Sequence, residues 1–296
     1  MIRIGLVDFD TSHVVAFTQR FNHIDIAEKE WVQGAKVVAG CPGESRIMPE
    51  RIPGYVAKLK EYGIELVARP EDLLGKIDAV MIESNQGSRH LAHARIFLEA
   101  GLPTFVDKPF SETVADADTM IRLAEKHHAP LLSCSALRYD SQIAAARSRA
   151  ETLGKILSVD TWTAASLHSG NPGLLHYGIH GVEMLYALMG TGCESVQFAG
   201  TDKSEVNLGL WSNGHVSAVR GLREGQSDFG AFVHYEKGNE VFTVKGSAYY
   251  SELCRVFVKM CETGQAPVPY KELREIIAFC SAAVTSREAR GIPITL

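Results

Sequence analysis

The first 125 residues of the chain alternate between short apolar runs and longer segments with helical spacing, and this alternation constrains the fold most strongly. The apolar runs are continuous, which is typical of strands that are buried on both faces of a parallel sheet. Strands are predicted at residues 2–7, 35–39, 64–67, 77–82, 104–106 and 131–133, with helices at 13–22, 70–74, 90–100 and 113–127. This order predicts a doubly wound parallel sheet, whose ligands bind beyond the carboxyl ends of the strands.

The pattern changes after about residue 150, where β-rich runs follow one another with short turns. Strands are predicted at 156–165, 195–199, 206–211, 215–222, 229–235 and 241–244, and helices at 175–189, 247–263 and 270–290. The dipeptide Asn213-Gly214 is a hairpin signal between two of these strands. The chain is therefore expected to form an α/β protein with a Rossmann-type domain over 1–125 and an α+β domain with a mixed or antiparallel sheet over 126–296. The helix near 270–290 is a candidate for packing back on the first domain.

Composition narrows the class of partner. The 296 residues are 46% hydrophobic, carry a net charge of -5 and contain no basic block, so nucleic acid is an unexpected partner. No apolar run approaches the roughly 20 residues that span a bilayer, and the first residues lack a signal-peptide pattern. The six cysteines are scattered, which favours reduced thiols over disulfides or zinc and predicts a cytoplasmic protein without membrane association.

Two segments carry candidate chemistry. The first, residues 78–110, reads strand, polar loop, helix, glycine and strand, and ends in Asp107-Lys108-Pro109. The second, residues 171–190, contains His176, His180 and Glu183 in an otherwise apolar stretch. On a helix these three residues share one face, and such a polar stripe must meet a cleft or hydrogen-bonding partners. The same spacing is also compatible with ligands of Zn²⁺ or another divalent ion, although no metal is expected here.

These segments resemble the Gfo/Idh/MocA family, named for glucose-fructose oxidoreductase and inositol dehydrogenase. In that family a histidine opens the helix, as His90 does here, and the next strand closes on Glu-Lys-Pro. Lys108 and Pro109 match this motif, while Asp107 replaces the glutamate. The resemblance implies that Lys108 lies near substrate and nicotinamide, where an ammonium group can stabilise charge that develops on the reacting oxygen.

The resemblance extends to the second segment and to the end of the chain. His180 matches the family histidine and is implied to exchange a proton with the substrate hydroxyl, with His176 or Glu183 orienting or tuning it. His176 stands where the family has an aspartate. An Arg-aromatic pair lines the cleft in the family, which makes Arg138 and Tyr139 candidate substrate contacts. Residues 281–296 resemble the family's terminal helix and strand.

The loop after the first strand departs from the family pattern. The three glycine positions of a dinucleotide-binding loop are occupied by Asp8, Asp10 and His13. Carboxylates near a diphosphate repel it unless they turn away or bind a cation. Thr11 and Ser12 at the helix start remain possible phosphate donors, because a helix N-terminus favours an anion. Alternatively, Asp10 or Ser12 caps the helix.

The resemblance implies a nicotinamide cofactor, either NAD or NADP. Glu44 lies a few residues beyond the end of the second strand, where an acidic residue would bind the ribose hydroxyls of NAD. Ser45 and Arg46 are suited to the 2′-phosphate of NADP, so the choice between NAD and NADP stays open. The candidate cofactor contacts lie after three predicted strands and comprise Asp8, Asp10, Thr11, Ser12, His13, Ser84, Asn85, Asp107, Lys108 and Pro109.

The function expected from these features is that of an NAD(P)-dependent dehydrogenase or reductase acting on a sugar, cyclitol or related hydroxy or keto compound. The replaced glycines keep two alternatives open: a non-redox or tightly-bound-cofactor lyase or hydratase, and a non-catalytic ligand-binding protein. For the dehydrogenase or reductase, the expected substrate contacts are Lys108, Arg138, Tyr139, His176, His180 and Glu183. A homo-oligomer, dimeric or larger, is expected through the exposed face of the second sheet, whose strands carry apolar residues on both alternations.

Overall fold

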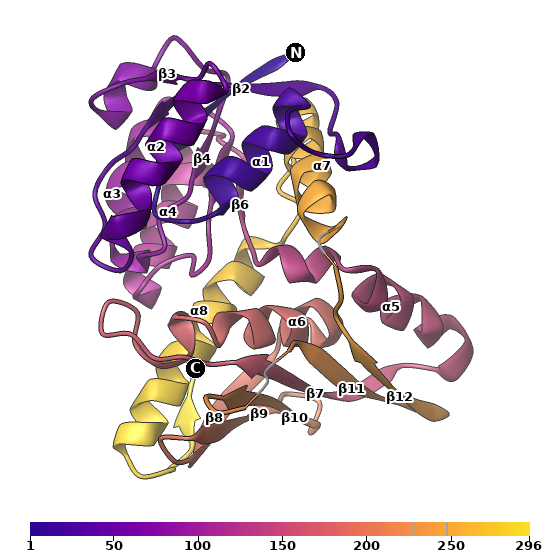
Figure 1. Cartoon of the computed structure of the whole chain (residues 1–296). Helices are drawn as coiled ribbons and strands as arrows, with labels where there is room; N and C mark the ends of the chain where they lie inside the picture. Colours follow the sequence, from indigo (N-terminus) through magenta and orange to yellow (C-terminus); the bar gives the residue numbers. More distant parts are fainter. Residues whose placement is uncertain (226–227, 247) are drawn as a thin grey trace. The chain divides into compact units, whose positions relative to one another are not determined.

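The computed structural model describes residues 1–225, 228–246 and 248–296, and the chain in it folds into two units (Figure 1). The first unit comprises Met1–Cys134 and Tyr250–Tyr270, and the second comprises Ser135–Tyr249 and Lys271–Leu296. Each unit is built around its own sheet. The sheet of the first unit is parallel and that of the second is mixed, which confirms the fold class expected from the sequence.

The sheet of the first unit contains six parallel strands in the order β3-β2-β1-β4-β5-β6. Nearly all their side chains are buried or half-buried, which explains the continuous apolar runs of the sequence. The order reverses between β1 and β4, and ligands of open parallel sheets bind at such a switch point. The strands are β1 (Ile2–Val7), β2 (Ala35–Cys41), β3 (Glu65–Leu66), β4 (Ala79–Ile82), β5 (Thr104–Val106) and β6 (Leu131–Ser133).

Helices connect these strands. Thr113 caps α4 by accepting a hydrogen bond from the backbone N–H of Asp116, which is the role that the Thr-x-x-Asp sequence of residues 113–116 predicts. Helix α2 is not predicted from the sequence, because Pro53 and Gly54 interrupt the helical pattern in its first turn. The helices are α1 (His13–Asn22), α2 (Ile52–Glu61), α3 (Gly87–Glu99) and α4 (Val114–Lys126), with 3₁₀ turns at Glu28–Glu30, Pro49–Arg51 and Pro70–Leu73.

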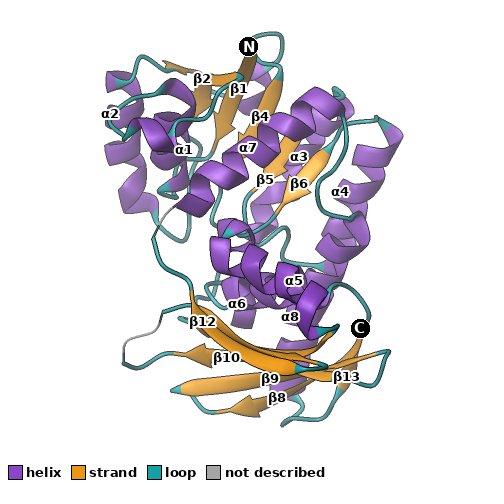
Figure 2. Ribbon diagram, turned by 90° about the vertical axis from the view of Figure 1, so that its right-hand side faces the viewer, coloured by secondary structure: helices purple, strands orange, loops and turns teal. Residues whose placement is uncertain are grey.

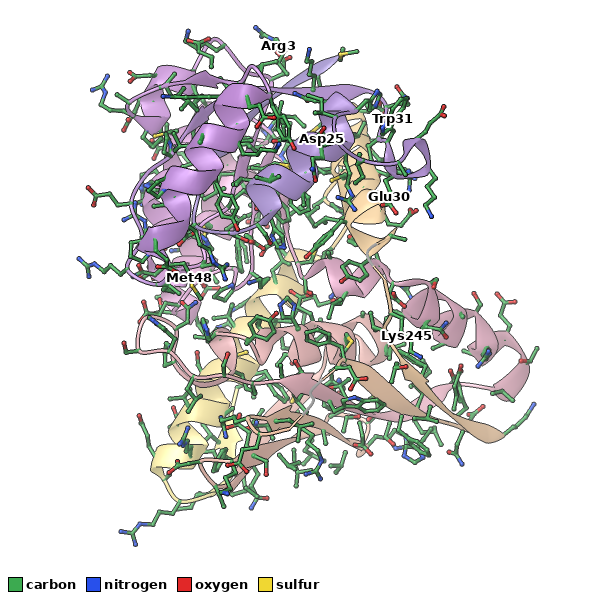
Figure 3. All side chains as sticks on the ribbon, in the orientation of Figure 1. Arg3, Asp25, Glu30, Trp31, Met48 and Lys245 are labelled. Carbon is green, nitrogen blue, oxygen red and sulfur yellow. The ribbon has the colours of Figure 1, made fainter. Side chains whose placement is uncertain are left out.

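A helix from late in the sequence completes the first unit. Most of α7 (Ala248–Thr263) belongs to it, whereas the helix near 270–290 was the candidate expected to pack on this unit. Phe257 of α7 packs edge-on against Phe105 of β5, with ring centroids 6.4 Å apart. Glu30, labelled in Figure 3, accepts a hydrogen bond of 2.7 Å from Ser251 of α7. Periodicity predicts an amphipathic helix but does not identify the surface on which it packs.

The second unit contains a seven-stranded sheet in the order β12-β11-β7-β10-β9-β8-β13. Its paired strands are antiparallel except β7 and β10, which are parallel. The predicted hairpin joins β9 to β10, and Gly214 adopts the positive φ of 84° that the turn requires. The strands are β7 (Ile156–Ala164), β8 (Cys193–Gly200), β9 (Ser204–Trp211), β10 (Val216–Leu222), β11 (Gly230–Tyr235), β12 (Gly238–Thr243) and β13 (Ile294–Thr295).

Helices α5 (Ser141–Leu153), α6 (Ile179–Met189) and α8 (Tyr270–Glu288) lie on one side of this sheet (Figure 2). Gly181 lets α6 approach closely, because a Cβ there would lie 2.7 Å from Thr163 of β7. Two 3₁₀ turns, Ala136–Tyr139 and Gly173–Leu175, precede α5 and α6. Helix α5 is not predicted from the sequence, because its alanine-rich sequence has only a weak apolar stripe.

The other side of the second sheet exposes apolar side chains. Leu208, Leu210, Val216 and Val241 are each more than one-third exposed. Register places Leu208 opposite Ala218, and Phe232 opposite Val241, so several strands contribute to the same face. Among the helices of residues 1–225, 228–246 and 248–296, none combines the length and apolarity needed to cross a membrane.

Candidate functional site

The carboxyl edge of the first sheet gathers many of the predicted cofactor residues. Asp8 follows β1, Ser84 and Asn85 follow β4, and Asp107 follows β5, and these three strands are neighbours in the sheet. Asp8, Ser84 and Asp107 are buried, and Asn85 is half-buried. The edge therefore brings together polar groups that are far apart in the sequence, at the place where ligands of parallel sheets bind.

Asp8 occupies the first glycine position and adopts a glycine-like φ of 62°. Its carboxylate contacts Nε of Arg89 at 3.3 Å and Nδ1 of His93 at 3.0 Å, both on α3. Burial opposes ionisation, but the interactions with His93 and Arg89 outweigh it and lower the pKa of Asp8. A Cβ on Gly43 would lie 1.8 Å from the Asp8 carboxylate, so that position beyond β2 requires glycine. The carboxylate is thus charge-compensated within its own unit.

Asp10 occupies the second glycine position and ties two loops together. Its carboxylate accepts hydrogen bonds from Oγ of Ser45 at 2.5 Å and from the backbone N–H of Asn85 at 2.9 Å. Burial raises the pKa of Asp10 despite these bonds. Ser12 stands at the N-cap of α1 but makes no side-chain cap bond. The alternative in which Asp10 or Ser12 caps this helix is therefore wrong, because Asp10 bonds to other loops and Ser12 adopts a helical backbone conformation.

His13, Glu83 and Asp107 form a buried cluster that the sequence analysis only partly anticipates. Nδ1 of His13 donates to Asp107 at 2.7 Å and lies 3.6 Å from Oε2 of Glu83. Burial disfavours a charged His13, but the charge and hydrogen bond of Asp107 raise the pKa of the imidazole. Burial raises the pKa of Glu83, whereas His13 and Lys108 keep the pKa of Asp107 low despite its burial.

Lys108 follows Asp107 directly at the end of β5, as the sequence predicts. The residue is 7% exposed, and its peptide bond to Pro109 is cis. Its backbone N–H donates to Oδ1 of Asp107 at 2.7 Å. The lysine is thus a largely buried residue next to a buried carboxylate, which argues against a freely solvated surface lysine.

His90 holds two loops of this edge together. It is fully buried on α3, and its ring nitrogens lie 2.9 Å from the carbonyl oxygen of Ser84 and 3.2 Å from that of Phe110. Burial lowers the pKa of the ring. The loop histidine of the motif therefore links the segments that follow β4 and β5.

The second unit places His180 in the first turn of α6. Nδ1 of His180 lies 2.7 Å from Oγ of Ser135, and its ring packs against Phe229 and Tyr177 with centroids 5.4 and 5.1 Å away. The side chain is half-buried rather than sealed in the core. A half-buried imidazole held by a hydroxyl group and two aromatic rings has the fixed orientation that proton transfer requires.

A buried ion-pair network lies one turn further along α6. Nε of Arg138 contacts Glu183 at 3.3 Å, and Nη2 of the same residue contacts Glu272 of α8. Burial raises the pKa of Glu183 to about 7, although Arg138 counteracts part of this effect. The guanidinium group of Arg138 therefore holds two carboxylates within the second unit. A contact between Arg138 and substrate stays a prediction.

His176 does not lie on the same helix as His180. The helix begins at Ile179, and residues 176–178 form a turn after the 3₁₀ segment. A Cβ at Gly178 would lie 2.5 Å from Leu174, so the turn is closely packed there. The predicted helical stripe of His176, His180 and Glu183 is therefore wrong for its first member. Within the described part of the chain, these three residues also do not form a metal-ligand cluster.

Several residues of these sites are absent from the sequence predictions. The helix α3 carries Arg89 and His93 four residues apart, so its periodicity indicates a shared face but not the partner Asp8. Glu83 ends the apolar run of β4, and a carboxylate at that place was a usable signal. Ser135 and Glu272 lie 45 and 92 residues before and after His180 in the chain, and no local pattern connects them to it.

Residues 48–134 match the family model described as "Oxidoreductase family, NAD-binding Rossmann fold". No curated protein matches the chain. Similar structures include the scyllo-inositol dehydrogenase of Lactobacillus casei, at 15% identity and a TM-score of 0.82, over 100% of this chain and 98% of that one.

Two further structures resemble the whole chain. The myo-inositol 2-dehydrogenase of Lactobacillus plantarum has 16% identity and a TM-score of 0.81, over 100% of this chain and 99% of that one. An oxidoreductase from Agrobacterium radiobacter, solved with NAD⁺, L-tartaric acid and magnesium, has 16% identity and a TM-score of 0.78, over 99% and 98%. At these identities the likeness establishes the fold.

Proposed function

Because residues 48–134 match the model of an NAD-binding oxidoreductase family, we propose that the chain belongs to the Gfo/Idh/MocA family and transfers a hydride between NAD(P) and a sugar, cyclitol or related hydroxy or keto compound. The observation that carries this proposal is Lys108, which lies buried at the end of β5 inside the matched segment. The structural neighbours named as inositol dehydrogenases support the substrate class.

The residues at the first sheet edge fit a dinucleotide. The carboxylate of Asp8 is compensated by Arg89 and His93, and that of Asp10 accepts two hydrogen bonds, so neither is an unscreened charge. Ser12 makes no side-chain cap at the start of α1, where Oγ1 of Thr11 accepts a hydrogen bond of 3.4 Å from the backbone N–H of His13. The N–H groups of a helix's first turn favour an anion. The residues proposed to hold the cofactor are Asp8, Asp10, Thr11, Ser12, His13, Ser84, Asn85, Asp107, Lys108 and Pro109.

The proposed chemistry assigns separate tasks to this chain's residues. The nicotinamide, when bound, supplies or accepts the hydride. Lys108 donates a hydrogen bond to the substrate oxygen and stabilises the negative charge that develops on it. His180 takes a proton from the substrate hydroxyl in oxidation and returns it in reduction. Glu183 and His176 are proposed to orient or tune His180, and Arg138 and Tyr139 are proposed substrate contacts.

A ligand panel tests the cofactor assignment. Saturating NAD, NADH, NADP or NADPH should stabilise the fold by about 2.7 kcal/mol at a concentration of 100 Kd, which thermal shift detects. The matching cofactor should then support turnover of inositols or related polyols, measured by absorbance of the reduced nicotinamide. Stabilisation by none of the four forms would overturn the proposal and favour the non-redox lyase.

We further propose a homo-oligomer and a cytoplasmic location. The exposed apolar side chains of the second sheet, Leu208, Leu210, Val216 and Val241, support self-association, because such a face is more often an interface than bare. The same face carries exposed Asp160 and Arg220, charges of opposite sign that suit a self-complementary contact. The cytoplasmic location remains a prediction from cysteine usage.

A further inference from the structure

We propose that His13, Glu83 and Asp107 form a binding site for one divalent transition-metal ion at the carboxyl edge of the first sheet. These residues come from the start of α1 and from the ends of β4 and β5. No residue of the site belongs to the second unit. The proposal goes beyond hydride transfer, because it assigns to this chain a cation that the dehydrogenase reaction does not require.

The geometry suits a shared ion. One ligand atom from each residue lies within 4.8 Å of the other two. Nδ1 of His13 is 2.7 Å from Oδ2 of Asp107 and 3.6 Å from Oε2 of Glu83. Two ligands about 2.0–2.2 Å from a tetrahedral metal ion are themselves about 3.4 Å apart. The observed separations bracket this value, so an ion fits with small side-chain movements.

Glu83 supplies an independent indication of a missing partner. The residue is 0% exposed, and neither of its carboxylate oxygens forms a hydrogen bond with any residue that the structure describes. Its contact with His13 at 3.6 Å is an ion pair without hydrogen-bond geometry. A buried carboxylate in this state costs free energy unless it is paired or coordinates a cation. Its oxygens approach the same His13 nitrogen as Asp107 does, which directs them into the cluster.

The surroundings hold the three side chains in place. The backbone N–H of Lys108 binds Oδ1 of Asp107 and leaves Oδ2 toward His13. The His13 ring stacks on Phe17 with centroids 4.9 Å apart and meets the edge of Tyr250 at 5.3 Å. Fixed orientation of the ligating side chains is what supporting contacts supply in metal sites.

The donor set selects the class of ion. One imidazole and two carboxylates suit Zn²⁺, Mn²⁺ or Fe²⁺ better than softer ions, which prefer thiolates. With His13 neutral as a ligand, the two carboxylates carry two negative charges, and Lys108 provides one nearby positive charge. A divalent ion replaces the proton between His13 and Asp107 and gives Glu83 a partner.

Metal binding by the purified protein tests this site without any need for turnover. After removal of metal with EDTA, Zn²⁺ is titrated by calorimetry and Mn²⁺ by electron paramagnetic resonance. The wild type should bind one ion per chain, and Glu83→Gln and His13→Gln should each weaken binding at least about tenfold. Asp140→Asn is the matched control, because it removes a buried carboxylate that lies in the second unit and outside the proposed sites, and it should bind metal like the wild type.

The variants remain informative about folding. Glu83→Gln without metal should melt no lower than the wild type, because it removes a buried carboxyl group whose oxygens accept no hydrogen bond within the described residues. If Glu83→Gln fails to fold, metal binding by His13→Gln tests the proposed site instead. Absence of binding by the wild type, binding unaffected by both cluster substitutions, or equal weakening by Asp140→Asn would overturn the metal site. Nicotinamide binding is measured separately, so failure of the dehydrogenase proposal is distinguishable.

Discussion

Oγ of Ser135 lies 2.7 Å from Nδ1 of His180, and the backbone of Ser135 also hydrogen-bonds Glu183. One residue therefore connects the proposed proton-transfer group with the buried network of Arg138. Because one ring nitrogen of a neutral histidine donates and the other accepts, the hydroxyl group at Nδ1 influences which tautomer is favoured. Ser135 is in this sense a positioning residue for His180.

Substitution Ser135→Ala should lower kcat/KM by about tenfold and shift the pH profile of kcat, because the ring loses its fixed orientation. Ser135→Thr keeps the hydroxyl group and should restore most of the activity and the original profile. Ser133→Ala is the control, since Oγ of Ser133 is buried and lacks a hydrogen bond within the described residues. An unchanged pH profile in Ser135→Ala would contradict the positioning role.

Lys108→Ala and His180→Ala should each lower kcat/KM by about 100-fold or more, as loss of electrostatic or acid-base assistance does. Lys126→Ala, at an exposed position at the end of α4, should retain full activity. Melting temperatures of all three variants check that the fold persists. Near-normal turnover in either of the first two variants would remove that residue from the mechanism.

The sequence predicts the first unit better than the second because its signals are local. The strands 2–7, 104–106 and 131–133 and the cap at Thr113 depend on short apolar runs and one side-chain bond, and the structure has them at those residues. The helix predicted at 175–189 begins only at Ile179 in the structure, because the apolar sequence before it does not indicate the turn at Gly178. Periodicity alone also could not determine that α7 joins the first unit.

The residues of the candidate sites also differ in how far the sequence alone identifies them. Lys108 and His180 are recognisable because each stands within a motif, whereas Glu83 pairs with His13 only through the adjacency of β1, β4 and β5. The carboxylates of Asp8 and Asp10 suggested repulsion of a diphosphate, since the sequence does not reveal that Arg89, His93, Ser45 and Asn85 meet them. Long-range pairing of this kind follows from the fold and not from spacing.

Glu183 should make stability depend on pH. Its pKa is raised to about 7 from an ordinary value of 4.5, so the folded state retains a proton that the unfolded state has lost between these values. Stability should therefore fall as pH rises from about 4.5 to 7, by on the order of 3 kcal/mol from this group. In Glu183→Gln this dependence should be smaller. Urea unfolding at pH 5 and 7.5 gives the change in the free energy of unfolding between these pH values. An equal change in the wild type and in Glu183→Gln would contradict the assignment.

The outer face of the second sheet should hold an oligomer together. Leu208→Glu combined with Leu210→Glu places two charges on that face and should convert the oligomer to monomers, seen by light scattering at micromolar concentration. Leu74→Glu is the control, because Leu74 is similarly exposed but belongs to the first unit. A wild-type protein that is already monomeric would exclude the interface.

The backbone at Asp8 separates the effect of its charge from the effect of its shape. Its φ of 62° suits glycine and tolerates asparagine, but strains alanine. Asp8→Ala should therefore be less stable than Asp8→Gly, although both lose the ion pairs with Arg89 and His93. Thermal unfolding of the two variants measures this difference, and equal melting temperatures would show that the positive φ is not maintained.

Removal of the same charge should strengthen dinucleotide binding. At an effective dielectric constant of about 20, a unit charge about 4 Å from a phosphate contributes up to roughly 4 kcal/mol before screening. In the wild type the carboxylate of Asp8 offsets the attraction that Arg89 and His93 would exert on a phosphate. Asp8→Gly and Asp8→Asn both remove that charge and leave Arg89 and His93 to attract the diphosphate, so each should lower the Kd for NAD(P) at least about tenfold. Calorimetric titration of wild type and both variants measures the effect. If only Asp8→Gly binds more tightly, shape rather than charge limits the affinity. If none of the three proteins binds any form of the nicotinamide, the dehydrogenase proposal itself fails, because removal of the Asp8 charge can strengthen only an interaction that exists.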